Sequence, residues 1–225
     1  MILPIVLSTV VSCSSTASKS LNLDRLDLAT KNVAVNTNLM TAAKNGHVSA
    51  IKNALLAGDL VNSVSAEGTA FSMSMKAKHQ GIAELLLKAG AHWQPGFDAD
   101  QPTALMLAAK AGNNSLVKNL ILKGAALNPI DKRGYSALAN AAVGRHLTTM
   151  KILINAGADV NASPDGLSVL MHVVEDNNTL LSQLLIAAGA DVNYRNEDGD
   201  TALKMARRKG YFDLDLMLVQ AGARL

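Results

Sequence analysis

The sequence is poor in cysteine and in aromatic residues. Its only cysteine is Cys13, so no disulfide can form within the chain, and export cannot be argued from disulfides. Phe, Trp and Tyr together make up only 3% of the sequence, although 49% of it is apolar. This composition favours a core of Leu, Ala, Val and Ile built from thin helical layers.

The chain also lacks a strong excess of charge. Its 21 Lys and Arg residues are balanced by 18 Asp and Glu residues, which leaves a formal net charge of +3. These charges are scattered, whereas nucleic-acid binding requires a clustered basic face. We therefore expect no nucleic-acid partner.

Signatures of catalysis are missing as well. No motif places a serine, a histidine and an acid together, and no glycine-rich phosphate loop follows a predicted strand. The acidic run at 196–200 lacks the twelve-residue spacing and the closing Glu of an EF-hand loop. The sequence therefore predicts a protein that is not an enzyme and has neither a cofactor nor a metal site. The remaining alternative from another class is an enzyme with an unrecognised site, which would need titratable groups that converge in a pocket.

What the sequence does contain is an internal repeat. A Gly-Ala pair returns every 32 to 34 residues, and a hydroxyl residue with Leu or Phe two places later keeps the same interval. Two independent markers with one period of about 33 residues indicate a repeat architecture. The pairs begin at Gly90, Gly124, Gly157, Gly189 and Gly222, with Gly58 one step earlier, and the hydroxyl residues are Thr37, Thr69, Thr103, Ser136, Ser168 and Thr201.

Each unit reads as two short helices. In residues 104–125, Gly112 and Gly124 stand where a left-handed residue ends a helix, and the Thr103 hydroxyl is placed to cap the first turn. A pair this short cannot bury its apolar residues alone, so it needs neighbours of the same kind. The period predicts helix pairs at 38–45 with 48–57, 70–77 with 80–89, 104–111 with 114–123, 137–144 with 147–156, 169–176 with 179–188, and 202–209 with 212–221.

Short motifs accompany the period. Residues 189–193 read Gly-Ala-Asp-Val-Asn and are followed by Asp-Gly-Asp-Thr at 198–201, while residues 42–47 read Ala-Ala-Lys-Asn-Gly-His. With these motifs, residues 37–225 resemble the ankyrin repeat family. The resemblance implies an all-α solenoid of six helix-turn-helix repeats with hairpin-like finger loops. It implies no particular chemistry, because ankyrin arrays share a fold rather than an activity.

The inter-helix turns depart from the family pattern. The glycine that the family has there is Lys78 in the second repeat, Arg145 in the fourth and Asn177 in the fifth. Residues other than glycine rarely adopt a positive φ, although asparagine is among those that tolerate it. We therefore predict looser or rearranged turns in the second and fourth repeats, helped by Gly81 and Gly144.

The period and the composition divide the chain into segments. The C-terminal helix carries Asp213, Asp215 and Gln220 among its apolar residues, as a cap would. The predicted segments are a signal peptide at 1–13, a flexible tether at 14–20, an N-terminal cap or lead-in at 21–36, and repeats at 37–68, 69–102, 103–135, 136–167, 168–200 and 201–225.

The N-terminal segment predicts export. An apolar run reaches Val11 and no acid occurs before Asp24, but the run is shorter than the roughly 20 residues that span a bilayer. It therefore reads as a secretory signal. Residues 10–13, Val-Val-Ser-Cys, resemble a bacterial lipobox, which implies a lipid on Cys13. With Ser14 next, the resemblance implies anchoring in the outer membrane on the periplasmic side.

Other interpretations of this segment stay open. No Lys or Arg precedes the apolar run, so the usual basic start of a signal is missing. A start codon placed too far downstream would explain this. The alternatives are cleavage after Ala17, which gives a soluble periplasmic protein, and an uncleaved N-terminus on a cytoplasmic or host-directed protein.

The family resemblance also implies a binding surface. In ankyrin arrays, protein partners meet the finger tips and the exposed side of the first helices, which line a concave face. We expect a monomer that binds a protein partner there, with contact to a membrane only through the N-terminal lipid. The candidates are Lys44, Asn45, Lys76, Lys110, Glu175, Asp176, Arg208 and Lys209 on the helices, and Trp93, Phe97, Lys132, Arg133, Tyr135 and Tyr194 on the fingers.

Two kinds of candidate have structural alternatives. Trp93 falls where Val160 and Val192 fall in their repeats, at the base of a finger, so it is expected either to pack there or to contact a partner. His47, His79 and His146 follow the inter-helix turns, where this family uses histidine for packing between repeats. We predict that they are structural rather than metal ligands.

Overall fold

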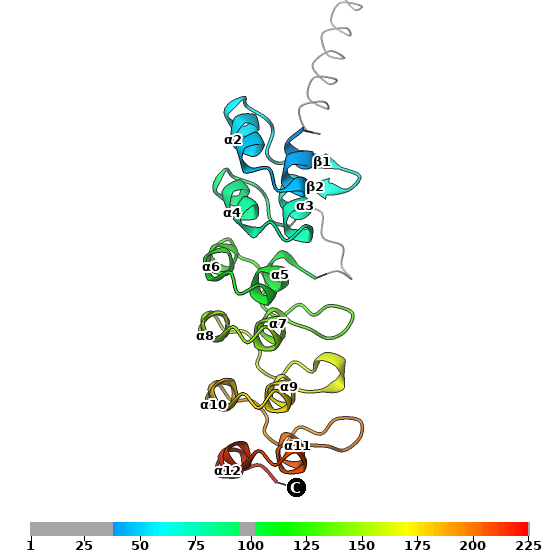
Figure 1. Cartoon of the computed structure of the whole chain (residues 1–225), viewed down its shortest axis with the longest axis vertical. Coiled ribbons are helices and arrows are strands. Elements are labelled where there is room, and N and C mark those ends of the chain that lie inside the picture. Colours follow the sequence, from blue (N-terminus) through cyan, green and yellow to red (C-terminus); the bar gives the residue numbers. More distant parts are fainter. Residues whose placement is uncertain (1–37, 95–101, 225) are drawn as a thin grey trace, which may run out of the picture.

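The structure is a computed structural model, and it describes residues 38–94 and 102–224. Within these ranges it consists of helix pairs stacked into a rod (Figure 1). The predictions for the signal peptide with Cys13, the tether at 14–20, the cap at 21–36 and Phe97 lie outside the described residues.

The helix pairs occur where the period places them. The first helices form one column, the second helices form another, and the finger loops project from the first column (Figure 1). The first helices are residues 38–45, α3 (Ala70–Lys76), α5 (Ala104–Lys110), α7 (Ala137–Val143), α9 (Val169–Glu175) and α11 (Ala202–Lys209). The second helices are α2 (Val48–Leu56), α4 (Gln80–Lys88), α6 (Asn114–Leu122), α8 (Leu147–Asn155), α10 (Thr179–Ala187) and α12 (Phe212–Gln220). The prediction of an all-α solenoid of six repeats is therefore confirmed.

The hydroxyl marker of the repeat is a helix cap. In α5 the Thr103 side chain accepts a hydrogen bond from the backbone N–H of Met106, which satisfies an amide that the first turn leaves without a helical partner. The same arrangement begins α3, α7, α9 and α11, with Thr69, Ser136, Ser168 and Thr201 as the caps.

The residue two places after each cap anchors the core. In all six repeats this residue is at most 2% exposed, and in the last five repeats a leucine of the second helix is fully buried in the same core. Small residues such as Ala108 and Ala141 beside them let neighbouring helices approach closely. The anchors are Leu39, Phe71, Leu105, Leu138, Leu170 and Leu203, and the second-helix leucines are Leu86, Leu120, Leu153, Leu185 and Leu218.

The prediction of rearranged turns in the second and fourth repeats is wrong. Lys78 and Arg145 have φ values of 64° and 58°, close to the 67° of Gly112 in the third repeat. The backbone hydrogen bond across the turn is also kept, because the His79 N–H bonds the Ser74 carbonyl at 2.8 Å. Packing of the helices on either side therefore imposes the left-handed conformation, at a cost of about 1–2 kcal/mol for a residue with a Cβ.

A ladder of asparagines joins the loops that follow the second helices. The Asn161 side chain accepts the N–H of Asp191 at 2.9 Å, and the Asn193 side chain accepts the N–H of Arg224 at 2.8 Å. Asn62 makes the equivalent bond between the first and second repeats, and Asn128 makes it between the third and fourth. Each bond spans neighbouring repeats, so the ladder fixes their spacing.

The fingers are built in different ways. The first is a hairpin in which β1 (Val64–Ser65) pairs antiparallel with β2 (Gly68–Thr69). The finger before α9 contains a short 3-10 helix, η1 (Pro164–Gly166). In the finger before it, Gly134 has a positive φ, and a Cβ there would lie 3.1 Å from the Ser163 carbonyl oxygen. Glycine at this position therefore allows the two fingers to approach.

The sixth repeat ends the stack with a polar pair. Arg207 and Asp215 occupy helix positions that hold buried residues in the preceding repeats, for example Ala142 and Met150. The two side chains bond each other at 2.9 Å. Their exposure replaces the apolar contact that another repeat would make, as expected of a capping repeat.

Candidate functional site

The candidate site is the row of residues that precedes the inter-helix turns. Because equivalent positions of stacked repeats lie above one another, Lys44, Lys76 and Lys110 follow each other along one side of the first helices. Val143 continues the row in the fourth repeat with 46% exposure, and Glu175 continues it in the fifth. We call this row, with the fingers beside it, the groove.

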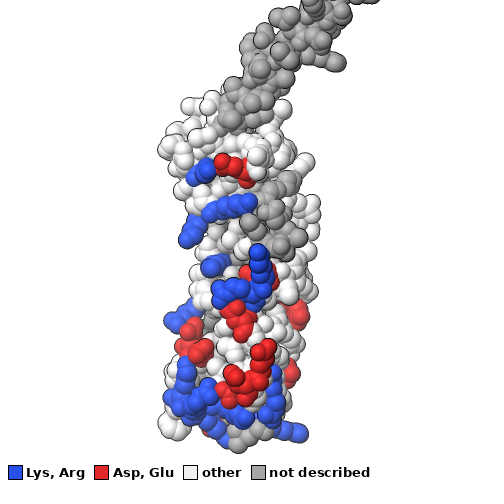
Figure 2. All heavy atoms as spheres, turned by 90° about the vertical axis from the view of Figure 1, so that its right-hand side faces the viewer, with Lys and Arg blue, Asp and Glu red and all other residues white. Residues whose placement is uncertain are grey.

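In the lower half of the groove, which runs over repeats four to six, the charged side chains pair with each other. Arg145 contacts Asp176 at 3.1 Å, and Lys209 contacts Glu175 at 3.3 Å, each between neighbouring repeats. Arg208 contacts Asp200 of its own finger at 2.6 Å. Figure 2 shows acidic and basic side chains lying together in this part of the face. Exposed pairs of this kind contribute little stability, but they neutralise the charges that a partner would use.

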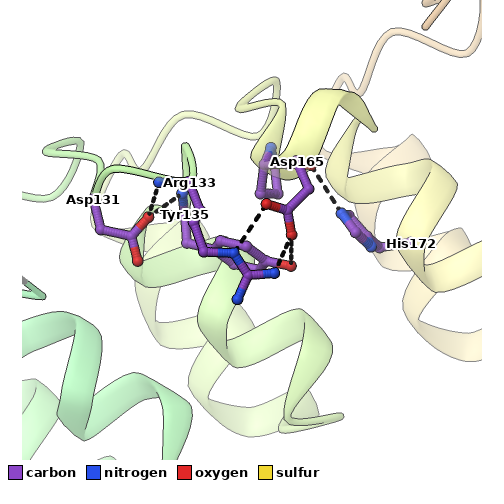
Figure 3. A network of polar contacts seen from close by, with 6 residues as sticks. Asp131, Arg133, Tyr135, Asp165 and His172 are labelled. Carbon is purple, nitrogen blue, oxygen red and sulfur yellow. Dashed lines mark hydrogen bonds and ion pairs between the residues drawn. The ribbon is translucent and has the colours of Figure 1, made fainter.

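Two fingers are joined by a polar cluster (Figure 3). The Arg133 guanidinium binds the Asp165 carboxylate through two nitrogens, with Nε at 3.0 Å from Oδ1. The Tyr135 hydroxyl donates to the same carboxylate at 2.9 Å, and Arg133 lies 5.1 Å from the centre of the Tyr135 ring. Asp131 accepts the backbone N–H groups of Arg133 and Tyr135, both at 2.9 Å, which sets the loop conformation.

The charges in this cluster shift each other's titration. Hydrogen bonds from Arg133 hold the pKa of Asp165 below its ordinary value, and the same bonds raise the pKa of Arg133. Burial raises the pKa of Tyr135, and the neighbouring Asp165 adds to this. Two candidate partner-binding residues, Arg133 and Tyr135, therefore hold one finger against the next.

The upper half of the groove, which runs over repeats one to three, contains two cavities. A cavity of 440 Å³ lies between the helix at 38–45 and the β1–β2 finger, and the buried side chains of Met40 and Met73 line it. Beside it a second cavity of 260 Å³ is lined by Met73, Lys76 and Ala77. Lys44 and Glu67 line both cavities and bond each other at 2.8 Å. This hydrogen bond from Lys44 lowers the pKa of Glu67.

Lys110 differs from the other charged members of the row. Its Nζ forms no ion pair with any residue in the described ranges. Its backbone carbonyl accepts a hydrogen bond from His146 Nε2 at 3.1 Å, which places the proton on that nitrogen because a carbonyl only accepts. The main chain at Lys110 is thus fixed by this hydrogen bond.

The remaining candidates are placed as follows. Trp93 is half-buried against the core, which agrees with the expectation that it packs at the base of its finger. The Tyr194 hydroxyl donates a hydrogen bond to the Gly166 carbonyl at 3.3 Å. Asn45 and Lys132 are exposed. The His79 ring lies against Gly46, where a Cβ would be 2.9 Å away, and the His146 ring lies against Gly112 and Gly144 in the same manner. These histidines pack between repeats.

Sequence reasoning missed the residues that complete the groove. Met40, Met73 and Glu67 were not among the candidates, and neither were the pairing partners Asp165 and Asp200. The repeat period offered a signal for the pairs, because Arg133 with Asp165 and Arg145 with Asp176 are 32 and 31 residues apart. No motif marked the cavity, because methionine at these helix positions reads as ordinary core.

The described residues offer neither a metal-binding cluster nor a membrane-spanning helix. No group of three or more His, Cys, Asp or Glu side chains there is placed to hold a metal ion. None of the helices in these ranges is both long enough and apolar enough to cross a membrane.

Fold and site together define a helical repeat solenoid with a side-chain-lined groove along its first helices. A family model described as ankyrin repeats (3 copies) matches residues 92–164. An ankyrin repeat domain from Acinetobacter baumannii AYE superposes with a TM-score of 0.71 at 30% identity, covering 83% of this chain and 98% of that one. The chain belongs to the ankyrin repeat family.

Other relatives extend the comparison. The ankyrin repeat domain of Bcl-3, a member of the IkappaB protein family, matches with a TM-score of 0.65 and 28% identity over 83% of this chain and 86% of that one. The nuclear factor NF-kappa-B p105 subunit of Gallus gallus is 34% identical over 161 residues, which are 69% of this chain and 16% of that protein. Human mitochondrial disaggregase is 33% identical over 89 residues, 40% of this chain and 13% of that protein. The chain thus spans a small part of the curated relatives it matches. Its ankyrin repeats imply a protein-protein interaction scaffold.

Proposed function

We propose that the chain is a non-catalytic scaffold that binds a protein partner through the upper half of the groove, over the first three repeats. The observation that carries this proposal is the contrast between the two halves. Ion pairs neutralise the lower half, whereas the upper half combines a methionine-lined cavity with the Lys110 ammonium, which forms no ion pair with the described residues. A hollow with an apolar floor and a few polar groups at its rim is what a binding site requires.

Site-specific photo-crosslinking tests this location. A photoreactive amino acid replaces Ala111, which is exposed in the groove beside Lys110, or Lys118, which is exposed on the second helix of the same repeat. After irradiation in the producing cells, we expect a protein adduct from position 111 and none from position 118. Equal adducts from both positions, or adducts from position 118 alone, would refute binding in the groove.

We further propose that the scaffold is exported and carries a lipid on Cys13, which anchors it in a bacterial outer membrane facing the periplasm. The support is the apolar run that ends in Val10, Val11, Ser12 and Cys13. Cells are labelled with a radioactive fatty acid, and Cys13→Ala is the matched control. Label in the unaltered chain and none in the variant is the expected result. Equal labelling of the two proteins would refute lipidation of Cys13. Recovery of the chain in the cytoplasmic fraction with an intact N-terminus would refute export.

A further inference from the structure

The chemistry of the upper groove specifies what kind of segment it holds. We infer that the partner presents an extended segment with one apolar side chain followed by acidic side chains about three residues apart. This inference rests on the proposed function, because it names the partner chemistry of the same groove.

The apolar side chain has a defined place. Met40 and Met73 are only 6% and 8% exposed, and both line the 440 Å³ cavity. Methionine is flexible and polarisable, so such a floor accepts a leucine or a methionine without one fixed shape. Ala66 of the β1–β2 finger closes the opposite wall without adding bulk.

The acidic side chains follow from the lysine row. Lys44, Lys76 and Lys110 stand at equivalent positions of three successive repeats, and packed helices are about 10 Å apart. An extended chain rises about 3.3 Å per residue, so one repeat corresponds to about three residues of a bound segment. An acid placed at every third residue therefore meets one lysine after another.

Glu67 shows how a carboxylate sits in this row. Its side chain, 63% exposed, reaches Lys44, 57% exposed, from the adjacent finger at 2.8 Å. An exposed pair of this kind is weak enough for an incoming carboxylate to replace it. Glu67 thus occupies the place that an acid of the partner would take, and it competes with that acid.

The lower groove sets a limit to the segment. Val143 interrupts the row in the fourth repeat, and Glu175 and Asp176 follow in the fifth. These carboxylates place negative charge in the row itself, so further acids of the segment would meet like charge there. The acidic segment is confined to the first three repeats.

A displayed library of random twelve-residue peptides tests the inference with the full chain. The library is selected on the unaltered protein and counter-selected on the triple variant Lys44→Glu, Lys76→Glu, Lys110→Glu. We expect enriched peptides that carry Leu or Met followed by Asp or Glu at three-residue intervals, in either chain direction. Enrichment of basic or uncharged peptides, or no enrichment over the triple variant, overturns the inference.

Affinity of an enriched peptide provides the second measurement. Glu67→Gln removes the competing carboxylate, and we expect it to tighten binding about two- to fivefold, as one exposed charge pair allows. Lys110→Glu should weaken binding by tenfold or more, while Lys118→Glu on the second helix should leave it unchanged. Weaker binding to Glu67→Gln would contradict the inference. The partner crosslinked at position 111 provides a separate check. If its contact segment lacks acidic residues, this inference is refuted while the proposed function is supported.

Discussion

Arg133 and Asp165 join two successive fingers, with the guanidinium Nε 3.0 Å from the carboxylate Oδ1 and the backbone N–H of Asp165 on the Arg133 carbonyl at 2.8 Å. Asp165 adopts a φ of 49°, so the contact holds an unusual backbone conformation as well as a charge pair. The two fingers therefore form one body, and the side chains that tie them together are engaged with each other.

The Asp165 pair makes stability depend on pH. Because Arg133 lowers the pKa of Asp165 in the folded chain below the roughly 3.9 of an unfolded aspartate, the pair stabilises the fold above that value. The contribution is lost as the pH falls through the lowered pKa. Asp165→Asn keeps the shape and tolerates the positive φ. We expect the unaltered chain to melt at a higher temperature than the variant at pH 7, with the difference shrinking as the pH falls below about 4. A difference that grows on acidification would contradict this.

The turn at Lys78 predicts a stabilising substitution. Lys78→Gly relieves the left-handed strain but gains freedom in the unfolded chain, so the expected net gain is about 0.5–1 kcal/mol in the free energy of unfolding. Lys78→Ala keeps a Cβ and should leave stability nearly unchanged. The free energies of unfolding of the unaltered chain and the two variants are measured in urea. An equal effect of Lys78→Gly and Lys78→Ala would show that backbone strain is not the cause.

Two buried serines predict effects of opposite sign. Ser182 is fully buried and its hydroxyl has no hydrogen-bond partner within the described chain, so Ser182→Ala should stabilise the fold by about 1 kcal/mol. Ser72 is equally buried, but its hydroxyl accepts the Thr69 N–H at 3.0 Å and donates to the Thr69 carbonyl at 3.1 Å. Ser72→Ala should cost about 1–3 kcal/mol. The same sign for both substitutions in urea unfolding would reject this assignment.

The asparagine ladder predicts the cost of losing one rung. Asn161→Ala removes the bond to the Asp191 N–H and should lower the free energy of unfolding by about 1 kcal/mol. Asn155→Ala, at an exposed position that ends α8 and makes no side-chain bond within the described ranges, is the matched control and should have little effect. Equal losses in the two variants would mean that the ladder adds nothing specific.

Much of this architecture could be predicted from the sequence because the residues that begin and end each helix lie within the same repeat. Thr103 caps its own helix, and the glycine of the turn ends it, so the helix bounds could be read from the period. Lys78 could not be read in this way. Propensity argues against a left-handed lysine, and the conformation is imposed by the packing of both helices, which is a property of the stack.

The groove was predicted less completely for a similar reason. Its row of residues could be predicted because the position of a residue in the repeat fixes the side of the helix on which it lies. Whether a charged residue forms an ion pair depends on a second residue about one repeat away, which the position does not reveal. Glu175 and Lys209 were expected to meet a partner, yet they bond each other at 3.3 Å. The cavity between Met40 and Met73 depends on how a finger lies over a helix, which no single repeat specifies.

The most direct test of the central claim compares two triple charge reversals of equal size. One variant carries Lys44→Glu, Lys76→Glu and Lys110→Glu in the groove, and the other carries Lys52→Glu, Lys118→Glu and Lys151→Glu on the exposed side of the second helices. Proteins that co-purify with each full chain from its own cells are quantified by mass spectrometry. We predict a partner that is retained by the unaltered chain and by the second variant but lost from the first. Retention of the same partners by both variants, or their loss from both, would contradict the claim that the upper groove is the binding surface.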